Sequence, residues 1–269
     1  MSSATPSPSP VREPGAAPAP AAILVAAHGD GGDLRRNAAI RTIAERLARR
    51  VDVPVAWAVL KEPDSFPAAR ADLGTAAEGP VAVYPFFMSD GYFVRVKLPR
   101  MLAASGFPRP QLLPTFGTDP LVVDLLERRL RSVAALQGGC EPKDFRILLV
   151  GHGSGSGEPA SRLRTEAVAA ELGYRGLGRV HVAFIEEAPF VEDAFRDVDP
   201  QIVVGFFASE GTHALDDVAT LVAERPQVLH HIAAIGSDLG VADMIAARIA
   251  EAAGSLHDGN EACISGETA

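Results

Sequence analysis

An internal repeat constrains the fold of this chain more than any other feature of its sequence. AHG at 27–29 recurs as GHG at 151–153, FFMSDG at 86–91 recurs as FFASEG at 206–211, and FGTD at 116–119 recurs as IGSD at 235–238. The three matches keep the same order and a nearly constant offset of roughly 120 residues, which is typical of a duplicated domain. We therefore expect two copies of one domain, facing each other across a cleft.

Short apolar runs alternate with amphipathic helical patterns in both copies, and this alternation predicts buried parallel strands covered by helices. The fold class that follows is α/β, with two tandem flavodoxin-like domains, each holding a parallel sheet of about four strands. Strands are expected at 23–27, 54–60, 81–87 and 112–116, and again at 146–150, 180–185, 201–207 and 228–235. The clearest helices are expected at 35–50, 120–136, 160–172, 214–224 and 241–253.

The composition shifts along the chain predict where these domains begin and end. Residues 1–21 are rich in Pro, Ala and Ser and indicate a disordered tail. An N-terminal domain over 22–137 and a C-terminal domain over 144–255 follow, joined near 137–143, and 256–269 form a second tail.

The charge balance narrows the classes of function. The 269 residues carry 25 Lys and Arg against 34 Asp and Glu, a formal charge of −9. A protein that coats nucleic acid concentrates positive charge instead, so we expect no nucleic-acid partner. No apolar run is long enough to span a membrane, no secretory signal is present, and the only cysteines, Cys140 and Cys263, form no motif. These features favour the cytoplasm.

Polar side chains that could bind a metal gather after the strands of the second copy. His152 follows the first strand, Glu186 ends the second, and His213 follows the third. The carboxyl ends of parallel strands share one edge of the sheet, where such folds present their ligands. Two imidazoles and a carboxylate there could hold a divalent cation and accept protons.

The first copy has lost two of these three groups. His28 is kept, but Lys61 stands at the position of Glu186 and Phe93 at the position of His213. We interpret the second copy as the working half and the first as degenerate. For any single histidine a structural role in a Gly-rich turn remains the alternative.

These motifs resemble the class II tetrapyrrole metal chelatases of the CbiX type, in their long two-domain form. The resemblance covers roughly residues 22–253 and rests on the His-Gly after the first strand, Phe-Ile-Glu at the end of the second, and Phe-Phe-x-x-x-Gly-x-His after the third. It implies ATP-independent insertion of cobalt(II) or iron(II) into sirohydrochlorin, in cobalamin or siroheme biosynthesis. The metal-site and catalytic residues it implies are His152, His213 and Glu186.

Sirohydrochlorin carries eight carboxylates, so an acidic protein needs local positive charge to bind it. The first copy supplies Arg95, Lys97 and Arg100, whereas the second places Glu210, Asp216 and Asp217 in the matching segment. We expect the basic segment to hold the substrate and the acidic one to guide the cation, although a solvated helix face is the alternative for each residue. His28, Gly153 and Gly211 complete the expected substrate-binding set.

Two other functions stay open from the sequence. One is a noncatalytic metal or tetrapyrrole carrier, and the other is a protoporphyrin ferrochelatase, which the basic segment disfavours. We expect no cofactor beyond the substrate metal and no iron–sulfur cluster, because the cysteine motif of some long family members is missing. The tetrapyrrole and the metal are the expected partners of a monomer.

Overall fold

The computed structural model describes residues 19–29, 37–154, 159–209 and 213–254, with only the backbone described for 213–217. Each half contains one parallel four-stranded sheet, with the order β2-β1-β3-β4 in the first and β6-β5-β7-β8 in the second. The first sheet comprises β1 (Ala22–Ala27), β2 (Val55–Val59), β3 (Val81–Phe86) and β4 (Pro110–Leu112). The second comprises β5 (Ile147–Gly151), β6 (Val180–Phe184), β7 (Ile202–Gly205) and β8 (His230–Ile232). The predicted duplicated α/β fold is confirmed.

The register of the strands repeats between the halves. Leu24 of β1 pairs with Val83 of β3, and the equivalent residues Leu148 of β5 and Val203 of β7 pair in the same way. The central strands are completely buried because helices cover both faces of each sheet. The outer strand ends sooner than predicted. The fourth strand is present, but the bounds 112–116 expected for it are wrong, since β4 spans Pro110–Leu112 and Phe116 begins a short 3₁₀ turn, η3 (Phe116–Thr118).

The helices fall into three groups according to the core that they cover. On one face of the first sheet lie α2 (Ser65–Leu73) and α3 (Leu98–Ala104), which continues a short π-helix, η2 (Phe93–Lys97). The matching face of the second sheet is covered by α6 (Val191–Val198) and α7 (His213–Ala223). The remaining four helices are α1 (Ala38–Leu47), α4 (Leu121–Ala135), α5 (Ala160–Leu172) and α8 (Val241–Gly254), and they share one continuous hydrophobic cluster that joins both halves.

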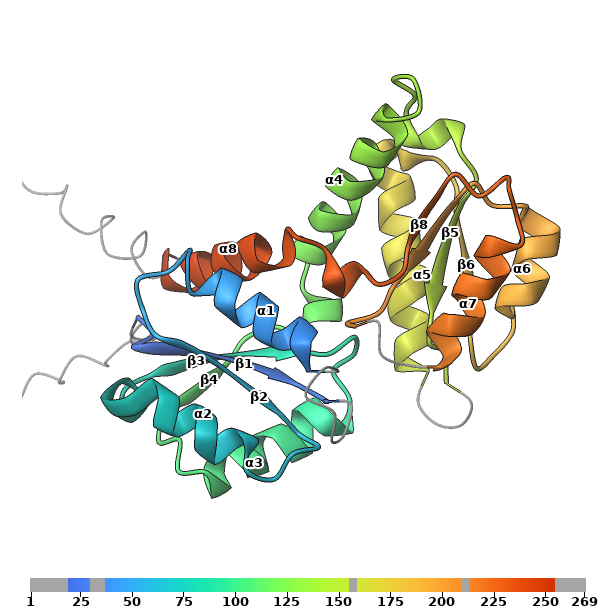
Figure 1. The fold of residues 1–269 in the computed structure, drawn as a ribbon. Coiled ribbons are helices and arrows are strands. Elements are labelled where there is room, and N and C mark those ends of the chain that lie inside the picture. Colours follow the sequence, from blue (N-terminus) through green and yellow to red (C-terminus); the bar gives the residue numbers. More distant parts are fainter. Residues whose placement is uncertain (1–18, 30–36, 155–158, 210–212, 255–269) are drawn as a thin grey trace, which may run out of the picture.

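The last helix of each half packs on the other half. Figure 1 shows α8, at the end of the chain, lying along α1 of the first half, while α4 lies along α5 of the second. Ion pairs follow the same exchange, because Arg175 beyond α5 pairs with Asp124 of α4, and Arg50 beyond α1 pairs with Asp243 of α8. The domain ranges 22–137 and 144–255 stay a prediction for the two sequence repeats. In the structure, the final helix of each repeat packs on the other repeat.

No helix in the described part of the chain is long and apolar enough to span a membrane.

Candidate functional site

The two His-Gly turns have the same backbone geometry in both halves. The carbonyl oxygen of His28 accepts the amide of Lys61 at 3.1 Å, and that of His152 accepts the amide of Glu186 at 3.0 Å. The glycines that follow have φ of +81° at Gly29 and +79° at Gly153, a region that residues with a side chain rarely adopt. Each turn thus places its imidazole beside the end of the neighbouring strand.

His152 and Glu186 form the polar pair of the second half. Nδ1 of His152 lies 3.5 Å from Oε2 of Glu186, and the two side chains are 49% and 47% exposed. A separation of 3.5 Å is longer than a typical hydrogen bond, so the two atoms are near each other but not tightly bonded. Because both side chains are about half exposed, a cation arriving from solvent could contact both groups.

The third expected ligand is only partly described. His213 begins α7, so its backbone starts a helix that follows the third strand, as expected, but its side chain lies outside the described residues. The same holds for Glu210 and Gly211 entirely, and for the side chains of Asp216 and Asp217. Among the side chains that the structure does describe, no group of three His, Cys, Asp or Glu could hold a metal ion. The complete ligand set thus stays a prediction.

The first half shows what occupies the equivalent position there. The ring of His28 lies edge-on to Phe93, with 4.5 Å between centroids and an interplanar angle of 81°. The next aromatic ring, Tyr92, lies 5.8 Å from Phe93, and Nζ of Lys97 lies 5.7 Å from the Phe93 centroid. Tyr92 and Phe93 are 62% and 41% exposed. We call His28, Tyr92, Phe93 and Lys97 the aromatic shelf.

The basic residues expected to hold substrate lie on η2 and the start of α3. Arg95 donates from Nε to Oδ2 of Asp90 at 3.1 Å and is 67% exposed, so its charge is partly matched by this carboxylate. Arg100 is exposed on the following turn. The three cations therefore share one exposed helical segment beside the aromatic shelf.

A supporting network around Glu187 was missed by the sequence analysis. Glu187 accepts the amide of Ser154 at 3.0 Å and a guanidinium hydrogen bond from Arg162 at 2.8 Å, which raises the pKa of Arg162. The amide of Gly153 donates to the hydroxyl of Ser161 at 3.2 Å. These contacts fix the turn that carries His152. The signal was present in the sequence, because an acidic residue, Glu62, is kept at the matching position of the first copy.

The halves meet at the carboxyl ends of their sheets. A cavity of about 70 Å³ is lined by His28 and other residues of the first half, together with Ala208 and Ser209 beyond β7 of the second. On the other side of the same boundary, Nε of Arg164 in α5 donates to the carbonyl oxygen of Gly117 in η3. The segment after β7 of the second half and the turn after β4 of the first half thus each lie against the opposite half.

Comparison with known proteins identifies relatives over most of the chain. The family model described as CbiX matches residues 22–133 and 146–252. A solved structure of CbiX, described as the terminal enzyme for siroheme biosynthesis in denitrifying bacteria, is 32% identical with a TM-score of 0.71, covering 85% of this chain and 97% of that one. SirB from Bacillus subtilis with Fe³⁺ is 18% identical with a TM-score of 0.68, covering 89% and 97%, and supports the fold alone.

A curated relative, the probable sirohydrochlorin cobaltochelatase of Halobacterium salinarum, is 29% identical over 177 residues. That match spans 56% of this chain and 60% of the relative. The repeated family match falls on the two halves that share their strand order and their His-Gly turns, and with it this chain belongs to the CbiX family.

Proposed function

We propose that the chain inserts a divalent metal ion, cobalt(II) or iron(II), into sirohydrochlorin without ATP. The observation that carries the proposal is the accessible pair of His152 and Glu186 at the carboxyl end of the second sheet. Membership of the CbiX family and the names of the relatives support the same reaction. His213, the first residue of α7, is the proposed third member of the metal site.

The reaction needs proton acceptors close to a metal ion that the protein binds weakly enough to release to the ring. Insertion breaks two pyrrole N–H bonds, forms bonds from the metal to the four ring nitrogens, and releases two protons. A neutral imidazole of His152 and the carboxylate of Glu186 can each take a proton, and their exposure lets water carry it away. Two or three weak ligands suit this task, because a closed tetrahedral site would retain the ion.

The aromatic shelf and its cations provide the proposed substrate surface. A flat macrocycle can stack on one of the two exposed rings, Tyr92 or Phe93, and contact the edge of the other, while Lys97, Arg95 and Arg100 face its peripheral carboxylates. The glycine turn at Gly153 would allow close approach of the ring, and Gly211, outside the described residues, stays a predicted contact. This surface favours a polycarboxylate over the more apolar protoporphyrin.

The direct test is to follow the visible absorption of sirohydrochlorin mixed anaerobically with cobalt(II) or iron(II), with and without the protein. We expect a clear acceleration of insertion, and the comparison shows which of the two metals the protein inserts faster. A spectral shift on mixing without acceleration would contradict the proposal and indicate a carrier. Faster insertion into protoporphyrin than into sirohydrochlorin would contradict the substrate.

Reversing the charge of the basic segment should weaken substrate binding. We expect the double substitution Arg95→Glu and Lys97→Glu to raise the sirohydrochlorin KM by about tenfold or more, because each lost contact between a cation and a carboxylate is worth roughly 1.5–3 kcal/mol when well formed. Arg109→Glu is the control. Arg109 is exposed and directly precedes β4, so it lies at the amino-terminal end of the strands, opposite to the carboxyl ends that carry the site. Equal KM values for the double variant and the control would refute this substrate surface.

The acidic net charge gives no basis for a nucleic-acid partner. We also propose that the protein works as a monomer in the cytoplasm, since one chain already brings two facing domains together.

A further inference from the structure

An ion pair is duplicated where the exchanged helices cross. Asp119 lies ahead of α4 and pairs with Arg248 of α8, while Asp238 lies ahead of α8 and faces Arg129 of α4. Both aspartates occupy the same position in the repeat, and so do both arginines. Each aspartate also accepts an amide at the start of its own helix, from Leu121 at 3.0 Å and from Gly240 at 2.8 Å.

The pair built on Asp119 is closed. Asp119 has no exposed side-chain surface, and Nη2 of Arg248 donates to its Oδ1 at 2.6 Å. Tyr84 of β3 donates from its hydroxyl to Oδ2 at 3.2 Å, and burial beside this carboxylate raises the pKa of the phenol. Both carboxylate oxygens are thus occupied by donors from three elements.

The pair built on Asp238 is open. Nε of Arg129 lies 3.6 Å from Oδ2 of Asp238, which is too long for a hydrogen bond. This Nε is one of only two buried side-chain nitrogen or oxygen atoms without a hydrogen-bond partner in the described part of the chain. The phenol of the first half has no equivalent here, because the strand register places Val204 at the position of Tyr84.

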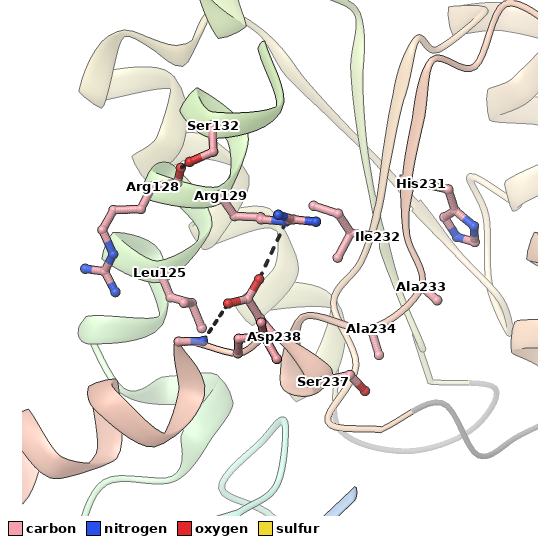
Figure 2. A pocket seen from close by; sticks show the side chains of 12 residues that line it. Leu125, Arg128, Arg129, Ser132, His231, Ile232, Ala233, Ala234, Ser237 and Asp238 are labelled. Atoms are coloured by element: carbon pink, nitrogen blue, oxygen red, sulfur yellow. Dashed lines mark hydrogen bonds and ion pairs between the residues drawn. The ribbon is translucent and has the colours of Figure 1, made fainter. Parts of the chain in front are cut away.

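A cavity of about 600 Å³ opens at this second crossing, between α4 and the segment from β8 to the start of α8 (Figure 2). We call it the seam cavity. Figure 2 shows Arg129 reaching from α4 toward Asp238 and Ile232, with Leu125 on the same helix. Its volume lies within the range of roughly 300–1,000 Å³ that small-molecule sites occupy.

The lining of the seam cavity combines positive charge with apolar walls. Arg128 and Arg129 contribute two guanidinium groups against the single carboxylate of Asp238. His230 lies next to the cavity, where its Nε2 accepts a long hydrogen bond of 3.4 Å from Nη2 of Arg129, and burial and the charge of Arg129 lower its pKa. The apolar wall comes from Leu125, Ile232 and Leu239. In a chain with a net charge of −9, this is a local excess of positive charge.

We propose that the seam cavity binds a small organic anion, with its phosphate or carboxylate group on Arg129 and its apolar body against Leu125 and Ile232, while Arg128 adds positive charge at the rim. Nε of Arg129 has no hydrogen-bond partner, and Nη2 makes only a long contact of 3.4 Å with Nε2 of His230, so this guanidinium keeps its capacity to donate to an oxyanion. In the first half the equivalent carboxylate, Asp119, is instead bound by donors of the protein, the Tyr84 hydroxyl and the Arg248 guanidinium.

This site is separate from the proposed metal site. None of His28, His152 and Glu186 lines the seam cavity. The two are nevertheless connected, because the amide of Gly236, next to Ser237 of the cavity lining, donates to the carbonyl oxygen of Phe207 at 2.9 Å. An anion at the crossing would therefore rest on the turn that supports the end of β7.

Calorimetric titration of the full chain with phenyl phosphate tests the proposal. We expect saturable binding of one equivalent, weakened by about tenfold in Arg129→Gln, as the loss of one charge-assisted contact predicts. Arg128→Gln should act in the same direction and serves as the second variant, because its side chain is exposed and its loss leaves the ion pair with Asp238 intact. Benzyl alcohol, which lacks the charge, should not bind, and inorganic phosphate should bind more weakly than phenyl phosphate.

Two controls distinguish the seam cavity from other basic surfaces. Arg131→Gln removes a cation of the same helix that pairs with Glu127 and Glu141 and does not line the cavity, so binding should be unchanged. The double variant Arg95→Gln and Lys97→Gln should also bind normally. Absence of saturable binding, or binding lost in that double variant and retained in Arg128→Gln and Arg129→Gln, would overturn the proposal.

Discussion

His152→Ala is expected to lower kcat for metal insertion into sirohydrochlorin by about 100-fold or more, within the range that a positioned acid or base contributes. The substitution removes the imidazole that lies 3.5 Å from the Glu186 carboxylate and leaves the backbone of the glycine turn in place. The side chain is half exposed, so its loss should cost little stability. Initial rates from the visible spectrum, with thermal unfolding as a fold check, measure the effect.

His28→Ala is the matched control for this prediction. His28 has the same backbone contacts in the first half, but its ring rests on Phe93 and its neighbour on the second strand is Lys61. It has no carboxylate in the position of Glu186, so we expect a change in kcat below about tenfold. Equal losses in the two variants would contradict the assignment of the metal site to the second half.

The structure confirms the part of the fold that periodicity and repetition specify. The alternation of apolar runs with helices predicted eight strands, and all eight are present, because buried parallel strands need continuous apolar runs. The sequence pattern specified the ends of the strands less well. Leu113 to Phe116 looked like a strand, but Pro114 has no amide to donate and Phe116 starts the turn η3.

The exchange of α4 and α8 could not be predicted in this way. An amphipathic helix specifies that one face is buried but not which sheet buries it. The apolar contacts between α1 and α8, and ion pairs such as Arg50 with Asp243, join residues that lie far apart in sequence. The short helices α2, α3 and α6 were also not predicted individually. Pro67 and Pro99 interrupt the pattern in two of them.

The candidate site was predictable only where strand ends determine it. The end of β5 and the end of β6 bring His152 beside Glu186, which follows from the edge that parallel strands share. The role of Glu187 depends on which of two adjacent carboxylates turns toward Arg162, and sequence spacing does not specify this. Phe93 was identified by the repeat, yet its edge contact with His28 emerged only from the structure.

Asp119→Asn is expected to destabilise the protein by about 3 kcal/mol, the lower end of the cost of breaking a buried ion pair. The amide keeps the volume of the carboxylate and an oxygen that can accept the amide of Leu121. It removes the charge that faces Arg248, whose side chain is only 17% exposed and would then lack its main partner. The Tyr84 hydroxyl would have at most the single amide oxygen of the asparagine as an acceptor, and water cannot reach this buried site to replace the lost one.

Asp238→Asn provides the comparison within the same molecule, because it makes the same chemical change at the other helix crossing. Arg129 and Asp238 are 39% and 16% exposed and 3.6 Å apart, so we expect a loss of about 1 kcal/mol or less. Urea unfolding, followed by circular dichroism and by the fluorescence of the single tryptophan, Trp57, measures both variants. The two signals should change together, because α1, α4, α5 and α8 share one core. Equal losses at the two aspartates would mean that the closed and open crossings differ in geometry but not in energy, and the case for an open seam would fail.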